Sequence, residues 1–172
     1  MPVTQGFPPV ASRDSKVLIL GSMPGNISLK QQQYYAHPRN SFWKIMGEMF
    51  GFHEETTYEQ RLKFLFANRI ALWDVLKTCY RDGSLDNSID ENTITLNAFD
   101  SFYRRHPEIR AVFFNGAKAE QVYRKYVLRD LPVQLCNHVL QRLPSTSPAN
   151  ARLTLSAKLE KWRVVYDQAS KT

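Results

Sequence analysis

Apolar and polar positions along the chain follow a pattern that predicts strands and helices in turn. The apolar run from Val17 to Leu20 is typical of a strand buried on both faces, and Gly21 closes it. After a polar loop, Ser41 opens a segment whose apolar residues recur at helical spacing. The same pattern predicts further strands at residues 70–75, 111–114 and 133–135. It predicts further helices at residues 58–67, 99–105, 116–126 and 153–169.

This order of elements predicts the α/β fold class. Strands that alternate with helices favour a three-layer α/β/α sandwich around a central, mostly parallel sheet of four or five strands. The sequence has no internal repeat and no linker, so we expect one domain over residues 1–172, with residues 1–15 as an extended lead-in. Ligands bind such sheets at the carboxyl ends of the strands. Function is therefore expected in the loops after Leu20, Val75, Phe114 and the region of Leu140.

Composition and charge narrow the class of protein. Hydrophobic residues make up 43% of the chain and aromatic residues 12%, which is too apolar for a disordered protein. Lys and Arg outnumber Asp and Glu by 23 to 16, and the net charge of +7 favours polyanionic partners such as nucleic acid. Charge alone does not distinguish a nucleic-acid-binding protein from one that is basic for other reasons. Sequence motifs must decide between the two.

Cysteine and histidine usage excludes several kinds of site. Cys79 and Cys136 are the only cysteines and form no C-x-x-C pair, so neither a disulfide framework nor a four-cysteine cluster can be built. The four histidines show no H-x-x-x-H spacing, so we expect no metal and no cofactor. No apolar run approaches the roughly 20 residues of a membrane span and no signal sequence is recognisable, so we expect a cytoplasmic protein without membrane contact.

Three segments carry residues suited to ligand binding. Gly21-Ser22-Met23-Pro24-Gly25 follows the first strand, and its glycines allow close backbone approach to a ligand, although a plain tight turn explains them as well. This segment lacks the spacing of a dinucleotide or P-loop motif. Tyr34-Tyr35-Ala36-His37-Pro38-Arg39-Asn40-Ser41-Phe42-Trp43 brings aromatic rings that can stack on a base and an arginine that can meet phosphate, with Phe42 and Trp43 expected in the core. The segment from Leu143 to Arg152 is rich in hydroxyl groups that can donate to phosphate, or is an ordinary capped loop.

Together, and in this order, the three segments resemble the motifs of the uracil-DNA glycosylase superfamily. The run from Tyr35 to Trp43 resembles a stretch shared by mismatch-specific uracil glycosylases and hypoxanthine-DNA glycosylases. The resemblance implies a uracil-DNA glycosylase-like fold and a monofunctional DNA glycosylase of base excision repair, which flips a deaminated base out of DNA and hydrolyses its N-glycosidic bond. DNA with deaminated bases, double-stranded or single-stranded, is then the expected partner, and we expect a monomer.

One departure from the family pattern points to a branch. Mismatch-specific uracil glycosylases carry an Asn in the first motif that positions the attacking water, and uracil-specific ones an Asp nearby, where this chain has Met23. A thioether cannot orient water in this way. The hypoxanthine-DNA glycosylase branch, which the first two motifs match best, assigns that duty to the Asn of the second motif, here Asn40. The resemblance therefore implies hypoxanthine (deoxyinosine) as the released base and Asn40 as the catalytic residue.

The resemblance and the loop positions give a set of candidate site residues. His37 is a second catalytic candidate because it could donate to the departing base, although a structural hydrogen bond explains it equally well. Asp74 could accept the ring N–H that hypoxanthine and uracil share, or merely cap a turn or pair with Arg81. Tyr35 is the expected stacking platform. The predicted base-binding residues are Ser22, Met23, Tyr35, Asp74 and Asn115. The predicted DNA-binding residues are Arg39, Ser145, Thr146, Ser147, Pro148 and Asn150.

Other functions stay open at this point. The same motifs fit a uracil or mismatch-specific uracil/thymine glycosylase, and also a non-catalytic module of the same fold that binds damaged DNA. A mononucleotide-binding α/β enzyme is disfavoured because its phosphate motif is missing. No lysine lies among the three segments as an imine mechanism would demand, so hydrolysis by a held water is expected.

Overall fold

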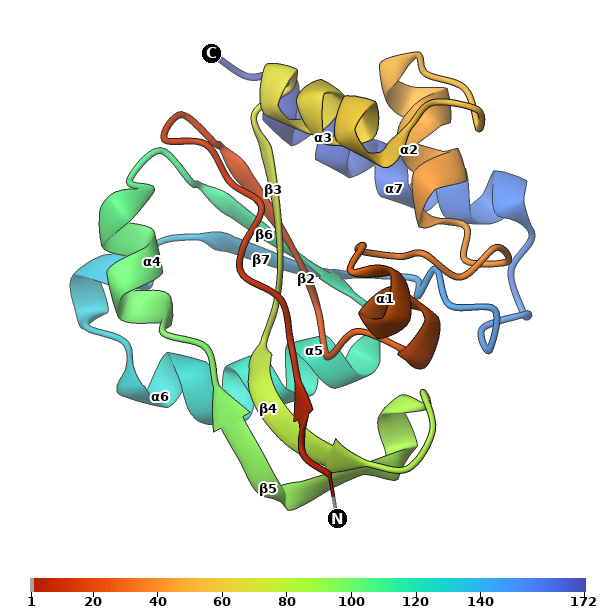
Figure 1. Cartoon of the computed structure of the whole chain (residues 1–172). Coiled ribbons are helices and arrows are strands. Elements are labelled where there is room, and N and C mark those ends of the chain that lie inside the picture. Colours follow the sequence, from red (N-terminus) through yellow and green to blue (C-terminus); the bar gives the residue numbers. More distant parts are fainter. Residues whose placement is uncertain (1) are drawn as a thin grey trace.

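A parallel sheet lies at the centre of the computed structural model, which describes residues 2–172 (Figure 1). Its strands, in spatial order, are β3 (Ile70–Asp74), β2 (Val17–Gly21), β6 (Ala111–Asn115) and β7 (Val139–Leu143). All three pairings are parallel, with Leu18 opposite both Ala71 and Val112. Because the strands run in one direction, their carboxyl ends meet at one edge of the sheet, which we call the carboxyl edge.

Side chains of β2 alternate between two apolar cores, one on each face of the sheet. Leu18 and Leu20 belong to one core, and Val17 and Ile19 belong to the other. The first core is covered by the helices α4 (Phe99–Arg105) and α5 (Ala117–Val122). The second is covered by α2 (Phe42–Phe50), α3 (Tyr58–Ala67) and α7 (Leu155–Ser170), which Figure 1 shows together on one side. The three-layer α/β/α sandwich with a four-stranded parallel sheet is therefore confirmed.

A smaller antiparallel sheet extends from the central one. Its strand order is β1 (Thr4–Gln5), β4 (Leu76–Arg81) and β5 (Ile89–Leu96). The lead-in is therefore tied down, because β1 pairs with β4 and Val10 forms an antiparallel bridge to Leu72 of β3. The short helix α1 (Asn26–Gln31) follows β2. The hydrophobic pattern predicts none of these four elements, since each is short or exposes much of its surface.

One predicted strand is wrong, and one predicted helix is longer and less regular than expected. Residues 133–135 form the 3-10 turn η3 (Val133–Leu135), because Leu135 N donates to Pro132 O (2.9 Å) and Val133, 84% exposed, has no sheet to cover it. The fourth strand is β7 instead. The helix predicted at 116–126 begins as α5 and continues through the π-helical stretch η2 (Tyr123–Val127) into α6 (Leu128–Asp130).

The other predicted helices lie within two residues of their expected bounds, and α2 begins directly after Ser41 as expected. None of the helices within residues 2–172 is long and apolar enough to cross a membrane.

Candidate functional site

The three motif segments meet at the carboxyl edge of the central sheet. The first segment is the loop after β2, and the third is the loop between β7 and α7. The second segment leads into α2. It is hydrogen-bonded to α1, which follows the first segment, and to the third segment. Ala36 N donates to Ser28 Oγ of α1 (3.0 Å), and Ser41 N donates to Thr146 O (3.0 Å). Candidate residues from distant parts of the sequence are thereby brought together.

Asn115 and Thr146 hold the third segment against the end of β6. Asn115 Nδ2 donates to Thr146 Oγ1 (2.9 Å), and Thr146 N donates to Asn115 Oδ1 (2.9 Å). The Thr146 side chain is 1% exposed, so the predicted DNA contact by its hydroxyl is corrected to a buried support of the loop. The Asn115 amide also lies close to the Tyr35 hydroxyl, whose pKa it lowers against the effect of burial. Gly116 has φ of +95°, and a Cβ there would lie 3.2 Å from Ser145 Cβ, so glycine lets the loop approach.

Asp74 ends β3 at the carboxyl edge, and its carboxylate is buried without a full set of partners. The residue is 4% exposed, and within residues 2–172 no hydrogen bond reaches Oδ2. A Cβ on the neighbouring Gly21 would lie 2.5 Å from Asp74 Oδ1, so only glycine leaves room for the carboxylate. Burial, reinforced by the charge of Asp86 and opposed by that of Arg81, raises the pKa of Asp74 to about 7. Asp74 is therefore near half-ionisation at neutral pH.

The second carboxylate, Asp86, is missing from the set that the sequence predicts. It begins the 3-10 turn η1 (Asp86–Ser88) between β4 and β5, and the Ser22 hydroxyl donates to it. The turn signal Asp82-Gly83-Ser84 indicates a hairpin at this point. Nothing in the sequence, however, places the tip of that hairpin against the first motif.

Arg81 is not the ion-pair partner of Asp74 that the sequence left open. Its guanidinium donates instead to the backbone carbonyls of Met23, Pro24 and Gly83, and so it holds the first motif in place. The Met23 side chain is 7% exposed and packs in the same apolar core as Leu20. Met23 therefore brings no polar group to the site.

Tyr35 has a backbone conformation that is unusual for a residue with a side chain. Its φ is +55°, in the left-handed region, which costs of order 1–3 kcal/mol and occurs at functional sites. Its ring stacks on Phe42, with centroids 4.0 Å apart, so one face of the ring is held by an aromatic neighbour. The hydroxyl is buried, and the polar side chain that approaches it is the Asn115 amide. Burial and the nearby Asp74 raise the pKa of Tyr35, so the hydroxyl stays a neutral donor.

His37 and Asn40 form a tight turn just before α2. His37 Nδ1 accepts from Arg39 N (3.0 Å), so a neutral His37 ring carries its proton on Nε2 and presents a donor there. Asn40 Oδ1 accepts from Phe42 N (2.9 Å), the first residue of α2, which fixes the orientation of the amide. Both side chains are half-buried rather than enclosed. The turn therefore presents an imidazole donor and a held amide side by side.

A groove of about 350 Å³ brings Tyr35, His37 and Asn40 together. The Tyr35 ring lines this groove, while its hydroxyl lies 3.2 Å from where a Cβ of Gly21 would be, next to Asp74. Tyr35 thus connects the open groove with the buried carboxylate. Lys44 also lines the groove, which the sequence reasoning missed, but its ammonium is ion-paired with Glu54 (3.4 Å).

The third segment is ordered by its own hydrogen bonds. Ser145 Oγ accepts from Ser147 N (3.2 Å), Ser147 Oγ accepts from Ala149 N (3.2 Å), and Asn150 Nδ2 donates to Ser145 O (3.1 Å). Ser147 and Pro148 are partly exposed, and Arg39 of the second segment is exposed. A surface of this kind, with fixed hydroxyl and amide groups beside a cation, is suited to phosphate.

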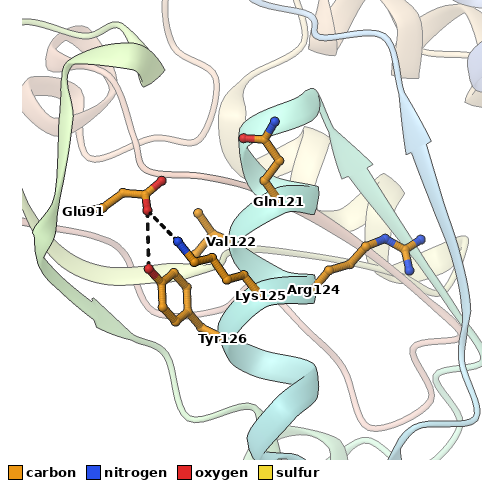
Figure 2. Close-up of a pocket in the computed structure, with 6 residues that line it drawn as sticks. All are labelled: Glu91, Gln121, Val122, Arg124, Lys125 and Tyr126. Carbon is orange, nitrogen blue, oxygen red and sulfur yellow. Dashed lines mark hydrogen bonds and ion pairs between the residues drawn. The ribbon is translucent and has the colours of Figure 1, made fainter.

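A larger hollow of about 480 Å³ lies outside the three segments (Figure 2). Glu91 of β5 faces α5 and η2 there and accepts hydrogen bonds from Lys118 (2.8 Å), Lys125 (3.3 Å) and the Tyr126 hydroxyl (3.3 Å). These bonds satisfy the carboxylate of Glu91. Glu91 is therefore not an unpaired acceptor as Asp74 is. In the described part of the chain, no three His, Cys, Asp or Glu side chains converge as metal ligands would.

Comparisons with known proteins agree on one family. Residues 8–168 match the model of the Uracil DNA glycosylase superfamily. A curated relative from Methanosarcina acetivorans, named hypoxanthine DNA glycosylase, is 37% identical over 165 residues, which cover 95% of this chain and 98% of that protein. A protein of the same name from Methanosarcina barkeri is 37% identical over 155 residues, 90% of this chain and 92% of its own.

A solved structure agrees as well. The solution NMR structure of a candidate uracil DNA glycosylase from Methanosarcina acetivorans superposes with a TM-score of 0.81 at 34% identity. The match covers 99% of this chain and 100% of that one.

Proposed function

This chain belongs to the uracil DNA glycosylase superfamily, and from that premise we propose that it is a monofunctional DNA glycosylase that releases hypoxanthine from DNA. It flips the deaminated nucleotide out of the base stack and hydrolyses the N-glycosidic bond, which leaves an abasic site. The name shared by the two curated relatives supports hypoxanthine as the base. The observation that carries the proposal is the buried Asp74 carboxylate, with Oδ2 unbonded, beside the buried hydroxyl of Tyr35 next to Gly21.

Asp74 is proposed to read the Watson–Crick edge of the flipped base. Hypoxanthine presents a ring N–H, which an ionised Asp74 accepts, whereas adenine presents an unprotonated ring nitrogen that leaves the carboxylate unpaired. A buried acceptor left without a partner costs about 1–3 kcal/mol, which is the expected penalty against the normal base. The base is proposed to stack on the Tyr35 ring, on the side away from Phe42. Asn115 and Ser22 complete the proposed pocket at the ends of β6 and β2.

Asn40 is proposed to hold the attacking water. Because Phe42 N already fixes Asn40 Oδ1, the amide is oriented before substrate arrives, and its second lone pair and NH2 group are available. The glycosidic bond breaks through an oxocarbenium-like sugar, so a held water and a stabilised leaving base are sufficient. His37 donates from Nε2 to the departing base. Lys44 lies in the same groove, where it is ion-paired with Glu54 (3.4 Å) rather than directed at the buried carboxylate of Asp74.

The DNA-binding face is proposed to include Arg39, Ser145, Ser147, Pro148 and Asn150. Their contacts are mainly with phosphate, so binding depends little on sequence and weakens steeply as salt is added. The net charge of +7 adds attraction at long range. We propose that the protein acts as a monomer in the cytoplasm, on double-stranded or single-stranded DNA.

A strand-break assay tests the function directly. Duplexes that carry one inosine, one uracil or no damage are incubated with the protein and then treated with alkali, which cuts at abasic sites. We expect breaks at inosine and none in undamaged DNA. Binding without any break would identify a non-catalytic damage-binding module. Breaks at uracil alone would favour the uracil glycosylase alternative, which the name of the structural neighbour supports.

A further inference from the structure

We propose that Arg61 of α3 holds a phosphate of the damaged DNA strand in the groove beside Tyr35, His37 and Asn40. This inference rests on the proposed function, because it takes that groove as the place where the flipped nucleotide lies. Arg61 belongs to none of the three motif segments, so the groove has a cation that the motifs do not supply. A phosphate contact at this point fixes the position of the strand, and with it the sugar, relative to the held water.

Two neighbours hold the guanidinium of Arg61 in the wall of the groove. Its Cζ lies over the ring of Trp43, 5.5 Å from the centroid, and its Nη2 donates to Glu54 O (2.6 Å). The Trp43 ring is itself fixed, because its Nε1 donates to Tyr34 O (2.8 Å) and the residue is 7% exposed. A guanidinium placed on an aromatic ring keeps its donors in a defined plane. The donors of Arg61 are therefore oriented before DNA arrives.

The start of α3 fixes the backbone of Arg61. Thr57 Oγ1 accepts from Gln60 N (3.3 Å), and Gln60 Oε1 accepts from Thr57 N (3.1 Å), so these two residues form a capping box. Arg61 N then donates to Thr57 O (2.9 Å) in the first turn. Arg61 thus extends from a capped helical turn rather than from a loop.

Arg61 has hydrogen-bonding capacity that the protein leaves unused. Its Nε is buried, and within residues 2–172 no acceptor bonds to it. A buried donor without a partner opposes folding unless a ligand supplies the acceptor. The guanidinium presents a planar fork of donors that matches two oxygens of one phosphate. A phosphate is therefore the ligand whose shape and charge fit this side chain.

The charges around the groove also favour an anion. Lys44 and Arg61 are cations, and Glu54 is the one acidic residue among the described residues that line the groove. The Glu54 side chain is 72% exposed, and its carboxylate pairs with Lys44 at 3.4 Å. Exposed ion pairs of this kind are weak, so a phosphate can take the place of the Glu54 carboxylate. Loss of Glu54 is therefore expected to favour DNA binding, whereas loss of Arg61 is expected to weaken it.

Two residues near the groove provide matched controls. Lys63 lies on the same helix, and Glu55 follows Glu54; both are exposed, and neither lines the groove. Lys63→Gln and Glu55→Gln therefore change the net charge as Arg61→Gln and Glu54→Gln do, and they report on long-range attraction alone. Arg61→Lys keeps the charge and loses the fork of donors.

The experiment measures binding by fluorescence anisotropy on a duplex with a tetrahydrofuran abasic analogue, which requires no base release. Arg61→Gln is expected to bind about tenfold more weakly than the wild type, because a charge-assisted hydrogen bond is lost. The slope of log K against log salt is expected to fall by about one. Arg61→Lys is expected to recover only part of the affinity. Glu54→Gln is expected to bind more tightly than Glu55→Gln, and Lys63→Gln to stay within about twofold of the wild type.

A second arm replaces one phosphate at a time around the analogue with a neutral methylphosphonate. At one position beside the analogue, the wild type is expected to lose about tenfold in affinity, because the charge that Arg61 meets is gone. On that duplex, the wild type and Arg61→Gln are expected to bind equally. The loss in the wild type does not depend on how well the variant folds.

Three results would overturn the inference. They are equal binding of Arg61→Gln and the wild type to the normal duplex, a difference between them that persists at every methylphosphonate position, and an equal loss in Lys63→Gln. A wild type that binds none of these duplexes would overturn it as well. If the wild type binds but releases no base in the strand-break assay, the proposed function fails, and the anisotropy measurements alone decide about Arg61.

Discussion

Two carboxylates, Asp74 and Glu91, lie in opposite electrostatic environments in this protein. Glu91 is partly exposed, and hydrogen bonds and charges from Lys118 and Lys125 lower its pKa to about 2. Asp74 is buried, no described residue bonds its Oδ2, and burial raises its pKa to about 7. Glu91 borders the larger hollow of the two, yet its acceptors are satisfied. The unpaired carboxylate, rather than the size of a hollow, is therefore the feature on which the proposed site rests.

The difference also indicates what each group does for the fold. A paired surface charge contributes a little stability, and its hydrogen-bonding capacity is already satisfied without a ligand. A buried unpaired charge opposes folding, and it is tolerated where it serves recognition or catalysis. The unusual backbone of Tyr35, next to Asp74 and remote from the Glu91 cluster, fits the same division. Four predictions test this contrast between the Asp74 site and the Glu91 cluster, beginning with the largest expected effect.

Replacing Asn40 with Ala is expected to lower the single-turnover rate on an inosine duplex by about 10²- to 10³-fold, because one preorganised group that holds water is lost. Binding to the duplex, measured by fluorescence anisotropy, is expected to survive. Asn40→Asp is the matched variant, since its carboxylate still accepts from Phe42 N at the start of α2. A wild-type rate in Asn40→Ala would move the catalytic role to His37.

Asp74→Asn is expected to stabilise the protein at pH 8 by up to about 4 kcal/mol, because it removes a buried charge. The folded-state pKa of Asp74 is raised from 3.8 to about 7, so stability falls as the pH rises through this window. Below about pH 4 the carboxyl group is neutral in both states, and the gain from Asn is expected to vanish. Urea unfolding of both proteins at pH 4 and pH 8 measures this, and a pH-independent difference would contradict it.

The same substitution is expected to weaken discrimination between hypoxanthine and adenine, by about 1–3 kcal/mol or roughly 5- to 150-fold in relative rate. An amide can donate to the unprotonated ring nitrogen of adenine, which an ionised carboxylate cannot. For the same reason, the wild type is expected to discriminate less below pH 7, where Asp74 is protonated. Release of adenine and hypoxanthine at pH 6 and pH 8 checks both statements. Discrimination that is identical at the two pH values in the wild type would count against Asp74 as the reader of the base.

Glu91→Gln is expected to have the smallest effect. The side chain of Glu91 is 40% exposed, so solvent screens its ion pairs and the loss of stability should be about 0–1 kcal/mol at neutral pH. Because the pKa of Glu91 is lowered to about 2, its contribution is present above about pH 5 and is lost as the pH falls through about 2. Excision rates are expected to match the wild type. A large loss of activity would show that the Figure 2 hollow takes part in function.

Much of the fold can be predicted from the local hydrophobic pattern. The elements that this pattern misses depend on contacts between residues far apart in the sequence. The run from Val17 to Leu20 is apolar at every position because both faces of β2 are covered, so it is recognised without knowledge of its neighbours. Residues 133–135 are apolar enough to suggest a strand, but Pro132 lies before them and β6 pairs with β7 instead. The β4–β5 hairpin has no clear apolar period, because most of β5 is exposed.

The candidate site divides in the same way. Tyr35, His37 and Asn40 are close in sequence, and their segment can be identified as a unit from its residues alone. Asp86 is joined to the site by a hydrogen bond from Ser22, 64 positions earlier in the chain. A contact between residues so far apart cannot be predicted from the local sequence pattern. The burial of Thr146 is equally hidden, because it depends on Asn115 of another strand.

The most direct test of the account compares the released bases in otherwise identical duplexes. Single-turnover rates of the wild type are measured with inosine, uracil or xanthine opposite each of the four normal bases. Hypoxanthine is expected to be released faster than uracil, because Met23 offers no polar group that could hold a water, while Asn40 remains. Uracil released at least as fast as hypoxanthine would contradict it.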